Sequence, residues 1–504
     1  MSRKRSRSED APAQLADLVP RLEAMPLDAS KLEVLVSNAL KTAEAALHYA
    51  AANASDIPSV HSAKDAADAA RESTFSHIER LEPEYNGAYA AAGLQYAAAL
   101  IVEAWLPGLL PASRADAARA ALRALDLAML RGGVDDWGRP AETLVRAAHC
   151  ILNESMRDEN HASSSNADDE HRPTADEVHA NRNRMEQGCT HFVAGASRAE
   201  ATSIPRVDAR TLTLADFEER FMRTRPAPTP VILTHAIDEW PAVRRSTGHK
   251  WSTAYLRRIA GGRLVPVETY ADEDATSTYL SESWDRKVIT LADYIDQYVD
   301  KSANAGGEEE ASGKASGKAN EETAISDAAA ERGYLAQHPL FDQIPTLRDD
   351  IDTPDFCRAR SQADDSAPDG CEVRNEPIVS AWIGPAGTVS PLHNDPFHNL
   401  LAQVVGSKYV RLIDARQTPR LYPRSGALCN NSHVNLDKPT PKEHPKFEGT
   451  PFWHCVLGPS EVLYIPRLCW HYVRSLEVSM SVSFWWGARM ALTCNDDGTV
   501  EERY

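Results

Sequence analysis

The chain has 504 residues, of which 42% are hydrophobic, and a formal net charge of −19 at pH 7. This length exceeds one ordinary core and suits two or three domains. So acidic a chain is poorly suited to direct binding of nucleic acid, and it contains no apolar run of the roughly 18–20 residues that would span a bilayer. Its charge favours a basic protein partner, such as an Arg- or Lys-containing segment.

The N-terminal stretch MSRKRSRSED is basic but has no apolar core after its charges, so we do not expect a secretory signal. The eight cysteines are scattered without a CxxC pair, which predicts reduced thiols and no zinc finger. We therefore expect an intracellular protein in the nucleus, the cytoplasm or both, and the basic start favours the nucleus.

Residues 10–154 predict an all-α domain, because apolar residues recur every three or four positions in segments such as ADAARAALRALDLAML. In that segment the recurring residues are Ala118, Leu122, Leu125, Leu127 and Leu130. Consecutive amphipathic helices are typical of an antiparallel bundle or a tetratricopeptide-like array, and the lack of a clear repeat period favours the bundle. We expect this domain to bind a partner protein rather than to carry out catalysis.

Two polar segments follow. Residues 155–193 have almost no large apolar side chains and predict a disordered linker. Residues 301–331 are rich in Gly, Ser and Glu and predict a surface insertion within the second domain.

Residues 194–504 predict a mostly β domain with helical additions. Short β-branched and aromatic runs separated by Pro and Gly are typical of a β-sandwich or barrel. The runs are TPVILTHAI, RLVPVETY, PIVSAWIGPAG, NLLAQVVGSKYVRLID, PSEVLYIPRLCWHYV and VSMSVSFWWG. LADFEERFMRT and STAYLRRIAG predict helices. The predicted fold class of the whole chain is α+β.

The stretch SPLHNDPFHN contains a candidate metal site. In an extended strand, His393 and Asp395 point to the same face because they are two residues apart. His471, in the apolar stretch EVLYIPRLCWHYV, is the candidate third ligand. Two histidines and one carboxylate with open positions suit non-haem Fe(II). The alternatives are a turn aspartate beside a surface histidine, and a core histidine that is hydrogen-bonded to backbone.

Other histidines are weaker candidates. His398 lies five residues after His393, and this odd spacing turns it to the opposite face of a strand. We expect it to line the cleft without binding the metal. His454 precedes the last strands and has no supporting motif.

Lys408 stands in the apolar run NLLAQVVGSKYVRLID, where burying an unpaired ammonium would be costly. Either its side chain reaches solvent, or it neutralises a dicarboxylate cosubstrate. Ser390 and Asn399 flank the HxD pair and are placed to donate hydrogen bonds to the same ligand.

The segments SPLHNDPFHNLLAQVVGSKYVRLI and EVLYIPRLCWHYVRSLEVSMSVSFWW together resemble the Jumonji-C Fe(II)- and 2-oxoglutarate-dependent oxygenases. The resemblance extends through TPVILTHAIDEWPA, VPVE, GYLAQHPLFDQIPTLRDDI and AWIGPAGTVSPLH, and covers about residues 205–487. It implies a double-stranded β-helix of the cupin or jelly-roll type. It also implies that His393, Asp395 and His471 hold Fe(II).

The same resemblance implies that 2-oxoglutarate and O₂ are cosubstrates. Lys408 would pair with the distal carboxylate of 2-oxoglutarate, and Asn399 and Ser390 would add hydrogen bonds. Tyr279, five residues before a Trp, resembles the cosubstrate-contacting tyrosine of the family, with Tyr270 as its rival.

The most similar branch of the family is assigned both arginyl C-3 hydroxylation of proteins and demethylation of methyl-lysine in histone H3. We expect protein hydroxylation at arginine, with histone demethylation as the alternative. Glu268 and Trp382 are the candidate substrate-binding residues, although Trp382 could equally be a core aromatic. Two other classes are a non-catalytic chromatin or protein adaptor and, less favoured, a metal-dependent endopeptidase acting on histone tails.

Overall fold

The computed structural model describes residues 97, 100, 111–132, 145, 148, 149, 152, 201–271, 279–280, 284–300, 331–438, 440–494 and 500–503. Most of the predicted helical domain, the predicted linker at 155–193 and all but the last residue of the predicted insertion at 301–331 lie outside these residues. Tertiary contacts divide the chain into two compact units. One comprises residues 1–170, 260–265 and 342–348, and the other comprises residues 171–259, 266–341 and 349–504. The domain boundaries drawn from the sequence stay predictions.

In the first unit, the predicted helix over ADAARAALRALDLAML is confirmed as part of α6 (Pro111–Gly132). Its buried side differs slightly from the predicted stripe. Leu127 and Leu130 are only partly buried, and alanines and a methionine take their place. The buried residues include Ala118, Ala121, Leu122, Leu125, Ala128 and Met129. Small side chains at this spacing allow close approach to neighbouring backbone.

A buried ion pair also lies within the first unit. The Asp126 carboxylate accepts hydrogen bonds from Arg263 Nε at 2.9 Å and Arg263 Nη2 at 2.5 Å. It also accepts from the Leu264 backbone N–H and from Gln343 Nε2. The Arg263 and Asp126 side chains are 1% and 0% exposed, so each buried charge is compensated by the other.

Replacing Arg263 with alanine should lower the free energy of unfolding by about 3–5 kcal/mol, because Asp126 would remain buried without its counter-charge. Urea denaturation followed by circular dichroism measures this change. Arg257→Ala is the control, since Arg257 pairs with Asp296 in a largely exposed ion pair and should cost less than about 1 kcal/mol. Equal, small losses in the two variants would contradict the prediction.

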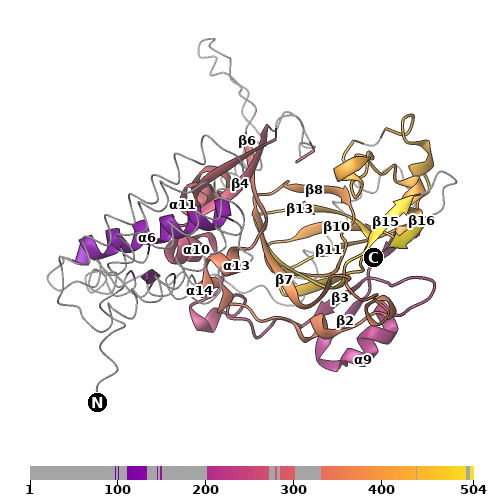
Figure 1. The fold of residues 1–504 in the computed structure, drawn as a ribbon, viewed down its shortest axis with the longest axis horizontal. Helices are drawn as coiled ribbons and strands as arrows, with labels where there is room; N and C mark the ends of the chain where they lie inside the picture. The colour runs from indigo at the N-terminus through magenta and orange to yellow at the C-terminus, as the bar shows by residue number, and fades with distance from the viewer. Residues whose placement is uncertain are drawn as a thin grey trace, which may run out of the picture. The chain divides into compact units, whose positions relative to one another are not determined.

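The second unit contains two facing β-sheets, as predicted for a cupin-like domain. The smaller sheet has the strand order β1 (Ala201–Ser203), β11 (Phe452–Leu457), β10 (Lys408–Ile413), β13 (Trp470–Ser475) and β8 (Val389–His393). Figure 1 shows β8, β13, β10 and β11 one after another across this sheet. All its pairs are antiparallel except β1 with β11.

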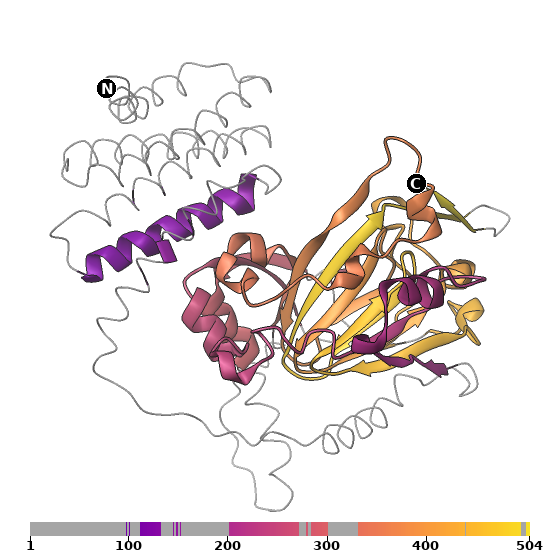
Figure 2. The same cartoon turned by 90° about the horizontal axis from the view of Figure 1, so that it is seen from below.

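The larger sheet contributes the opposite wall (Figure 2). Its order is β2 (Arg206–Asp208), β3 (Val231–Thr234), β12 (Glu461–Ile465), β9 (His398–Val405), β14 (Ser479–Ala488), β7 (Val373–Gly384), β6 (Glu331–His338), β4 (Leu264–Ala271) and β5 (Asp285–Thr290). A separate hairpin pairs β15 (Ala491–Cys494) with β16 (Val500–Arg503). Each of the six runs predicted as β overlaps at least one of these strands.

The core lies between the two sheets. Ile232, Leu401 and Leu463 of the larger sheet meet Val410 and Leu457 of the smaller one in a single buried cluster. A second cluster, which includes Leu392, Tyr409 and Trp470, belongs to the smaller sheet. The smaller sheet is therefore buried on both faces, which explains the long apolar runs in its strands.

Both predicted helical segments are confirmed. LADFEERFMRT forms α9 (Leu214–Phe217) and continues as the π-helical turn Glu218–Met222, and STAYLRRIAG forms α10 (Thr253–Ala260). The other short helices are α11 (Leu291–Tyr294), α13 (Leu340–Gln343), α14 (Pro345–Arg348) and α15 (Gln362–Asp365), with a second π-helical turn at Ile295–Val299. Short 3₁₀ turns lie at Ala209–Thr211, Arg245–Thr247, Asp355–Arg358, Ala415–Arg420, Gly426–Leu428 and Pro445–Phe447. Among the described residues, no helix has the length and apolar character needed to cross a membrane.

Candidate metal centre

The structure brings His393, Asp395 and His471 together. One ligand atom from each lies within 4.8 Å of the others. His393 Nε2 is 3.8 Å from Asp395 Oδ1, and His471 Nε2 is 3.4 Å from Asp395 Oδ2. Among the described residues this is the one group of three such side chains with metal-ligand spacing.

The strands place the two histidines by direct pairing. His393 is the last residue of β8 and lies opposite His471 of β13. The register then shifts, so that Ser390 lies opposite Val473. A step of three residues along β8 therefore matches a step of two residues along β13. This irregularity lets both Ser390 and His393 face the interior, although they are an odd number of residues apart.

Asp395 reaches the site differently from the sequence prediction. The prediction placed it on the same strand face as His393, but β8 ends at His393 and Asp395 lies in the following loop. The loop is held from two sides, because Leu468 N–H donates to the Asp395 carbonyl at 2.9 Å and Met490 N–H donates to the Pro396 carbonyl at 3.0 Å. Tertiary contacts of this loop, rather than strand alternation, orient the Asp395 carboxylate toward the two histidines.

The imidazole orientations fit a metal ion. His393 Nδ1 is 2.7 Å from the Pro391 carbonyl, and His471 Nδ1 is 3.0 Å from the Cys469 carbonyl. A carbonyl can only accept, so each Nδ1 carries a hydrogen and each Nε2 faces the Asp395 carboxylate. Backbone acceptors of this kind orient metal-binding histidines. Two Nε2 atoms and one carboxylate form the donor set that suits Fe(II).

The electrostatics of the triad are strongly coupled. Burial, together with the charge of His471, lowers the pKa of His393 to about 4. Burial opposes ionisation of Asp395, but its hydrogen bond and charge interactions with His471 outweigh that effect and lower its pKa. The site therefore keeps an anionic carboxylate beside a neutral His393, which favours a bound cation.

Lys408 lies in the same cavity as the triad. It is the first residue of β10 and only 2% exposed. Its Nζ is 3.5 Å from Tyr334 Oη and 5.9 Å from the centre of that ring. Among the described residues it has no carboxylate partner, and burial lowers its pKa to about 7. Of the two predicted outcomes, exposure to solvent is therefore wrong.

Ser390 and Asn399 line this cavity as well. Both are buried, and the Oδ1 atom of Asn399 has no hydrogen-bond partner. Polar atoms at this depth normally have hydrogen-bond partners, so the unpaired Asn399 oxygen indicates a cavity that suits a polar ligand. Its free space is about 30 Å³, and we expect side-chain rotation to accompany the binding of a five-carbon diacid.

Tyr279 does not line the Lys408 cavity. It donates a hydrogen bond to Asn431 Oδ1 at 2.5 Å, and Asn431 forms a β-bridge with His393. Tyr270, the predicted alternative to Tyr279, does not line the cavity either. The tyrosine that lines it is Tyr334. Sequence reasoning missed Tyr334, although it lies in GYLAQHPLFDQIPTLRDDI, one of the segments that carry the family resemblance.

The two candidate substrate residues occupy different places. Trp382 lines the triad cavity, and its Nε1 donates to Ser483 Oγ at 2.8 Å. Glu268 is not among the lining residues, but it lies directly opposite Tyr334 across β4 and β6. Opposed residues share one face of a sheet. Burial raises the pKa of Glu268, and its nearest cation is Arg286 at 3.9 Å.

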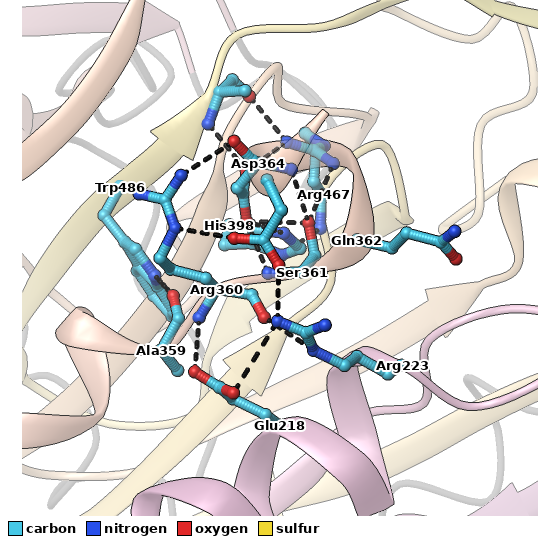
Figure 3. Close-up of polar contacts among 12 residues, drawn as sticks. Glu218, Arg223, Ala359, Arg360, Ser361, Gln362, Asp364, His398, Arg467 and Trp486 are labelled. Atoms are coloured by element: carbon cyan, nitrogen blue, oxygen red, sulfur yellow. Dashed lines mark hydrogen bonds and ion pairs between the residues drawn. The ribbon is translucent and has the colours of Figure 1, made fainter. Parts of the chain in front are cut away.

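His398 is buried but does not join the triad. Its Nδ1 accepts the Arg467 backbone N–H at 3.2 Å, so the ring hydrogen is on Nε2, which faces Asp364 Oδ2 at 3.7 Å. Burial lowers the pKa of His398 to about 3. His398 and Asp364 lie side by side in Figure 3. His454 contacts Tyr409 and Phe452 and is also outside the triad.

Comparison with known proteins indicates the same class of domain as the two facing sheets and the triad. Residues 215–491, more than half of the chain, match the family model of the cupin-like domain. Three relatives cover 55–56% of this chain. Lysine-specific demethylase 8 of Danio rerio is 41% identical over 285 residues and covered over 58% of its length. Lysine-specific demethylase JMJ30 of Arabidopsis thaliana is 39% identical over 287 residues and covered over 56%.

Jumonji C domain-containing protein 5 of Drosophila melanogaster is 36% identical over 285 residues and covered over 59% of its length. The chain thus spans little more than half the length of these relatives. The predicted resemblance to Jumonji-C proteins is confirmed. The chain belongs to the cupin-like domain family and is similar to proteins named for a Jumonji-C domain.

Proposed function

We propose that the protein is an Fe(II)- and 2-oxoglutarate-dependent oxygenase that acts on a protein side chain. The observation that carries this proposal is Lys408, which lies buried in the cavity of a two-histidine, one-carboxylate triad and has no carboxylate partner among the described residues. Burying an unpaired charge is costly, and an anionic cosubstrate beside the metal would offset that cost.

His393, Asp395 and His471 would hold the metal. Together with 2-oxoglutarate, Fe(II) supplies the oxidation of a C–H bond by O₂, with succinate and CO₂ as co-products. Lys408 would neutralise the distal carboxylate, and Ser390 and Asn399 would hydrogen-bond to the same ligand. Tyr334 and Trp382 would exclude water from the cavity.

For the substrate, we propose an N-methyl-lysine side chain in a basic protein segment. Two of the relatives carry the name lysine-specific demethylase, which favours demethylation over the arginyl hydroxylation preferred from the sequence. The net charge of −19 on this chain favours a basic partner. Such a substrate also supports a nuclear location.

Arginyl hydroxylation remains the second candidate because of Glu268. Its carboxylate lies on the sheet face of Tyr334 and would pair with a guanidinium, for which a planar, bidentate partner is favourable. Trp382 would then pack against the aliphatic part of the same side chain.

Mass spectrometry of peptides after turnover separates these reactions. With purified protein, Fe(II), 2-oxoglutarate and a trimethyl-lysine histone H3 peptide, we expect a product that has lost one methylene mass, with formaldehyde released. A product heavier by one oxygen on an unmethylated arginine peptide would instead support hydroxylation. Shortened peptides would indicate an endopeptidase.

The control for this experiment is His393→Ala, which should form neither product. If neither reaction occurs with any peptide while cellular effects persist in His393→Ala, a non-catalytic adaptor would be the better interpretation.

A further inference from the structure

A second cavity, of about 440 Å³, lies in the same unit and shares no residue with the triad cavity. Its volume is within the range of small-molecule sites. Part of its wall is apolar and includes Met222, Pro226, Pro228, Trp453 and Pro466. Its charged wall consists of Arg223, Arg225, Arg416, Arg467 and Asp414. Four guanidinium groups from three separate segments thus surround it with one carboxylate.

We propose that this cavity binds a small polyanion that carries phosphate or carboxylate groups. The arginine excess runs against the charge of the whole chain, which is −19. Guanidinium groups are the preferred partners of planar or tetrahedral oxyanions. This proposal concerns a site separate from the metal centre and does not rest on the proposed oxygenase function.

Arg225 is the most available of the four arginines. Its Nη2 donates to the side-chain oxygen of Gln362 at 2.7 Å, and among the described residues no carboxylate pairs with it. Both Arg225 and Gln362 are exposed. A neutral amide leaves the guanidinium charge uncompensated, so an incoming anion gains this interaction without displacing another anion.

Two further arginines can turn toward a ligand at small cost. Arg416 pairs with Asp414 at 2.6 Å, and Arg223 pairs with Asp365 at 2.7 Å. The Arg416 and Arg223 side chains are 54% and 38% exposed. The Arg223–Asp365 pair is exposed on both sides and contributes little to stability, and a multivalent anion offers Arg416 more charge than the single carboxylate of Asp414 does.

Arg467 forms the fixed part of the wall. Figure 3 shows it beside Asp364, with Gln362 extending away from both. Arg467 Nη1 donates to Asp364 Oδ1 at 2.9 Å and to the Ala488 carbonyl at 2.7 Å. Asp364 is further held by Ser361, whose N–H and hydroxyl both donate to Oδ2 at 2.6 Å. This network gives the cavity a rigid, preorganised side.

The cavity adjoins segments that carry the metal centre. Cys469 and His398 line it, two residues before His471 and one residue before Asn399, respectively. An anion bound there would lie against both segments.

Isothermal titration of the metal-free 504-residue chain tests the proposal, with sodium pyrophosphate and sodium citrate as probes at constant ionic strength set by NaCl. We expect saturable binding of one ion per chain. Gln362→Glu places a carboxylate on Arg225 with almost no change of shape and should weaken binding roughly tenfold. Arg225→Ala should weaken it by a similar factor.

Two controls locate the site. Arg210→Ala removes an exposed arginine that contacts Asp208 with the same geometry as Arg416 with Asp414, but lies outside the cavity, and should leave binding unchanged. Lys408→Met should also leave it unchanged, which excludes binding in the triad cavity. The proposal is overturned if neither anion saturates, if Gln362→Glu binds like the unmodified chain, or if only an acidic peptide such as hexaglutamate binds.

Discussion

Lys408→Met is expected to abolish measurable 2-oxoglutarate binding and, in the same molecule, to stabilise the fold. Methionine keeps the length of the side chain but removes a charge that is buried without a carboxylate partner among the described residues. We expect the dissociation constant of 2-oxoglutarate to rise by about 100-fold or more, and the free energy of unfolding of the metal-free protein to rise by about 1–3 kcal/mol. Calorimetry and urea denaturation measure the two effects.

The stabilising effect should depend on pH in a defined direction. Burial lowers the pKa of Lys408 from 10.5 to about 7. Between these values the unfolded chain holds a proton that the folded chain has released, so the free energy of unfolding rises with pH across this window. Below about pH 7 both states are protonated and the penalty is fully present. The advantage of Lys408→Met should therefore be greatest at or below pH 7 and disappear near pH 10.5.

Lys287→Met is the matched control, since the Lys287 side chain is partly exposed and pairs with Glu331. It should change neither 2-oxoglutarate affinity nor the rise in stability between about pH 7 and pH 10.5, because pairing with Glu331 raises the pKa of Lys287 above its usual value of 10.5. A destabilised Lys408→Met protein that binds 2-oxoglutarate normally would show that the ammonium has a structural role only.

His471→Ala is expected to weaken metal binding by more than about 100-fold. Loss of a group that only orients a metal ligand by hydrogen bonding typically lowers metal affinity 10–100-fold, and loss of a direct ligand lowers it more. The affinity can be measured with Co(II), whose absorption spectrum also reports the ligand set, and oxygenase activity should fall in parallel. Circular dichroism checks that the variant is folded.

His454→Ala provides the comparison, because His454 was the weaker histidine candidate in the sequence. It stands on β11 and is absent from the triad. We expect its Co(II) affinity to match that of the unmodified protein. The assignment of the third ligand fails if His454→Ala loses the metal while His471→Ala retains it.

The fold of the second unit could largely be predicted from local pattern. Runs such as NLLAQVVGSKYVRLID are rich in β-branched residues and contain a Gly, and they form β9 and β10 with a turn between them. Almost every residue of β9 and β10 is buried, which makes this run predominantly apolar and gives a strong signal. The triad residues were identifiable because His393 and Asp395 lie two residues apart, His471 is a polar group in an apolar strand, and both segments carry the family resemblance.

Other features depended on tertiary structure. Strand alternation predicted that Asp395 continues β8, yet the loop contacts of Leu468 and Met490 place it instead. The register shift between β8 and β13 cannot be read from one strand, because it is a property of the pair. Tyr334 reaches Lys408 through the pairing of β6 with its neighbours, whereas the family resemblance pointed to Tyr279.

The sequence by itself therefore determined the class of the β domain, the three candidate metal ligands and the lysine beside them. Those residues belong to local patterns whose physical meaning does not depend on distant contacts. Only the tertiary structure decided which tyrosine lines the Lys408 cavity, how Asp395 is aimed, and that Arg225, Arg416 and Arg467 surround a second cavity. Such arrangements join segments far apart in the chain, and packing alone fixes the distances between them.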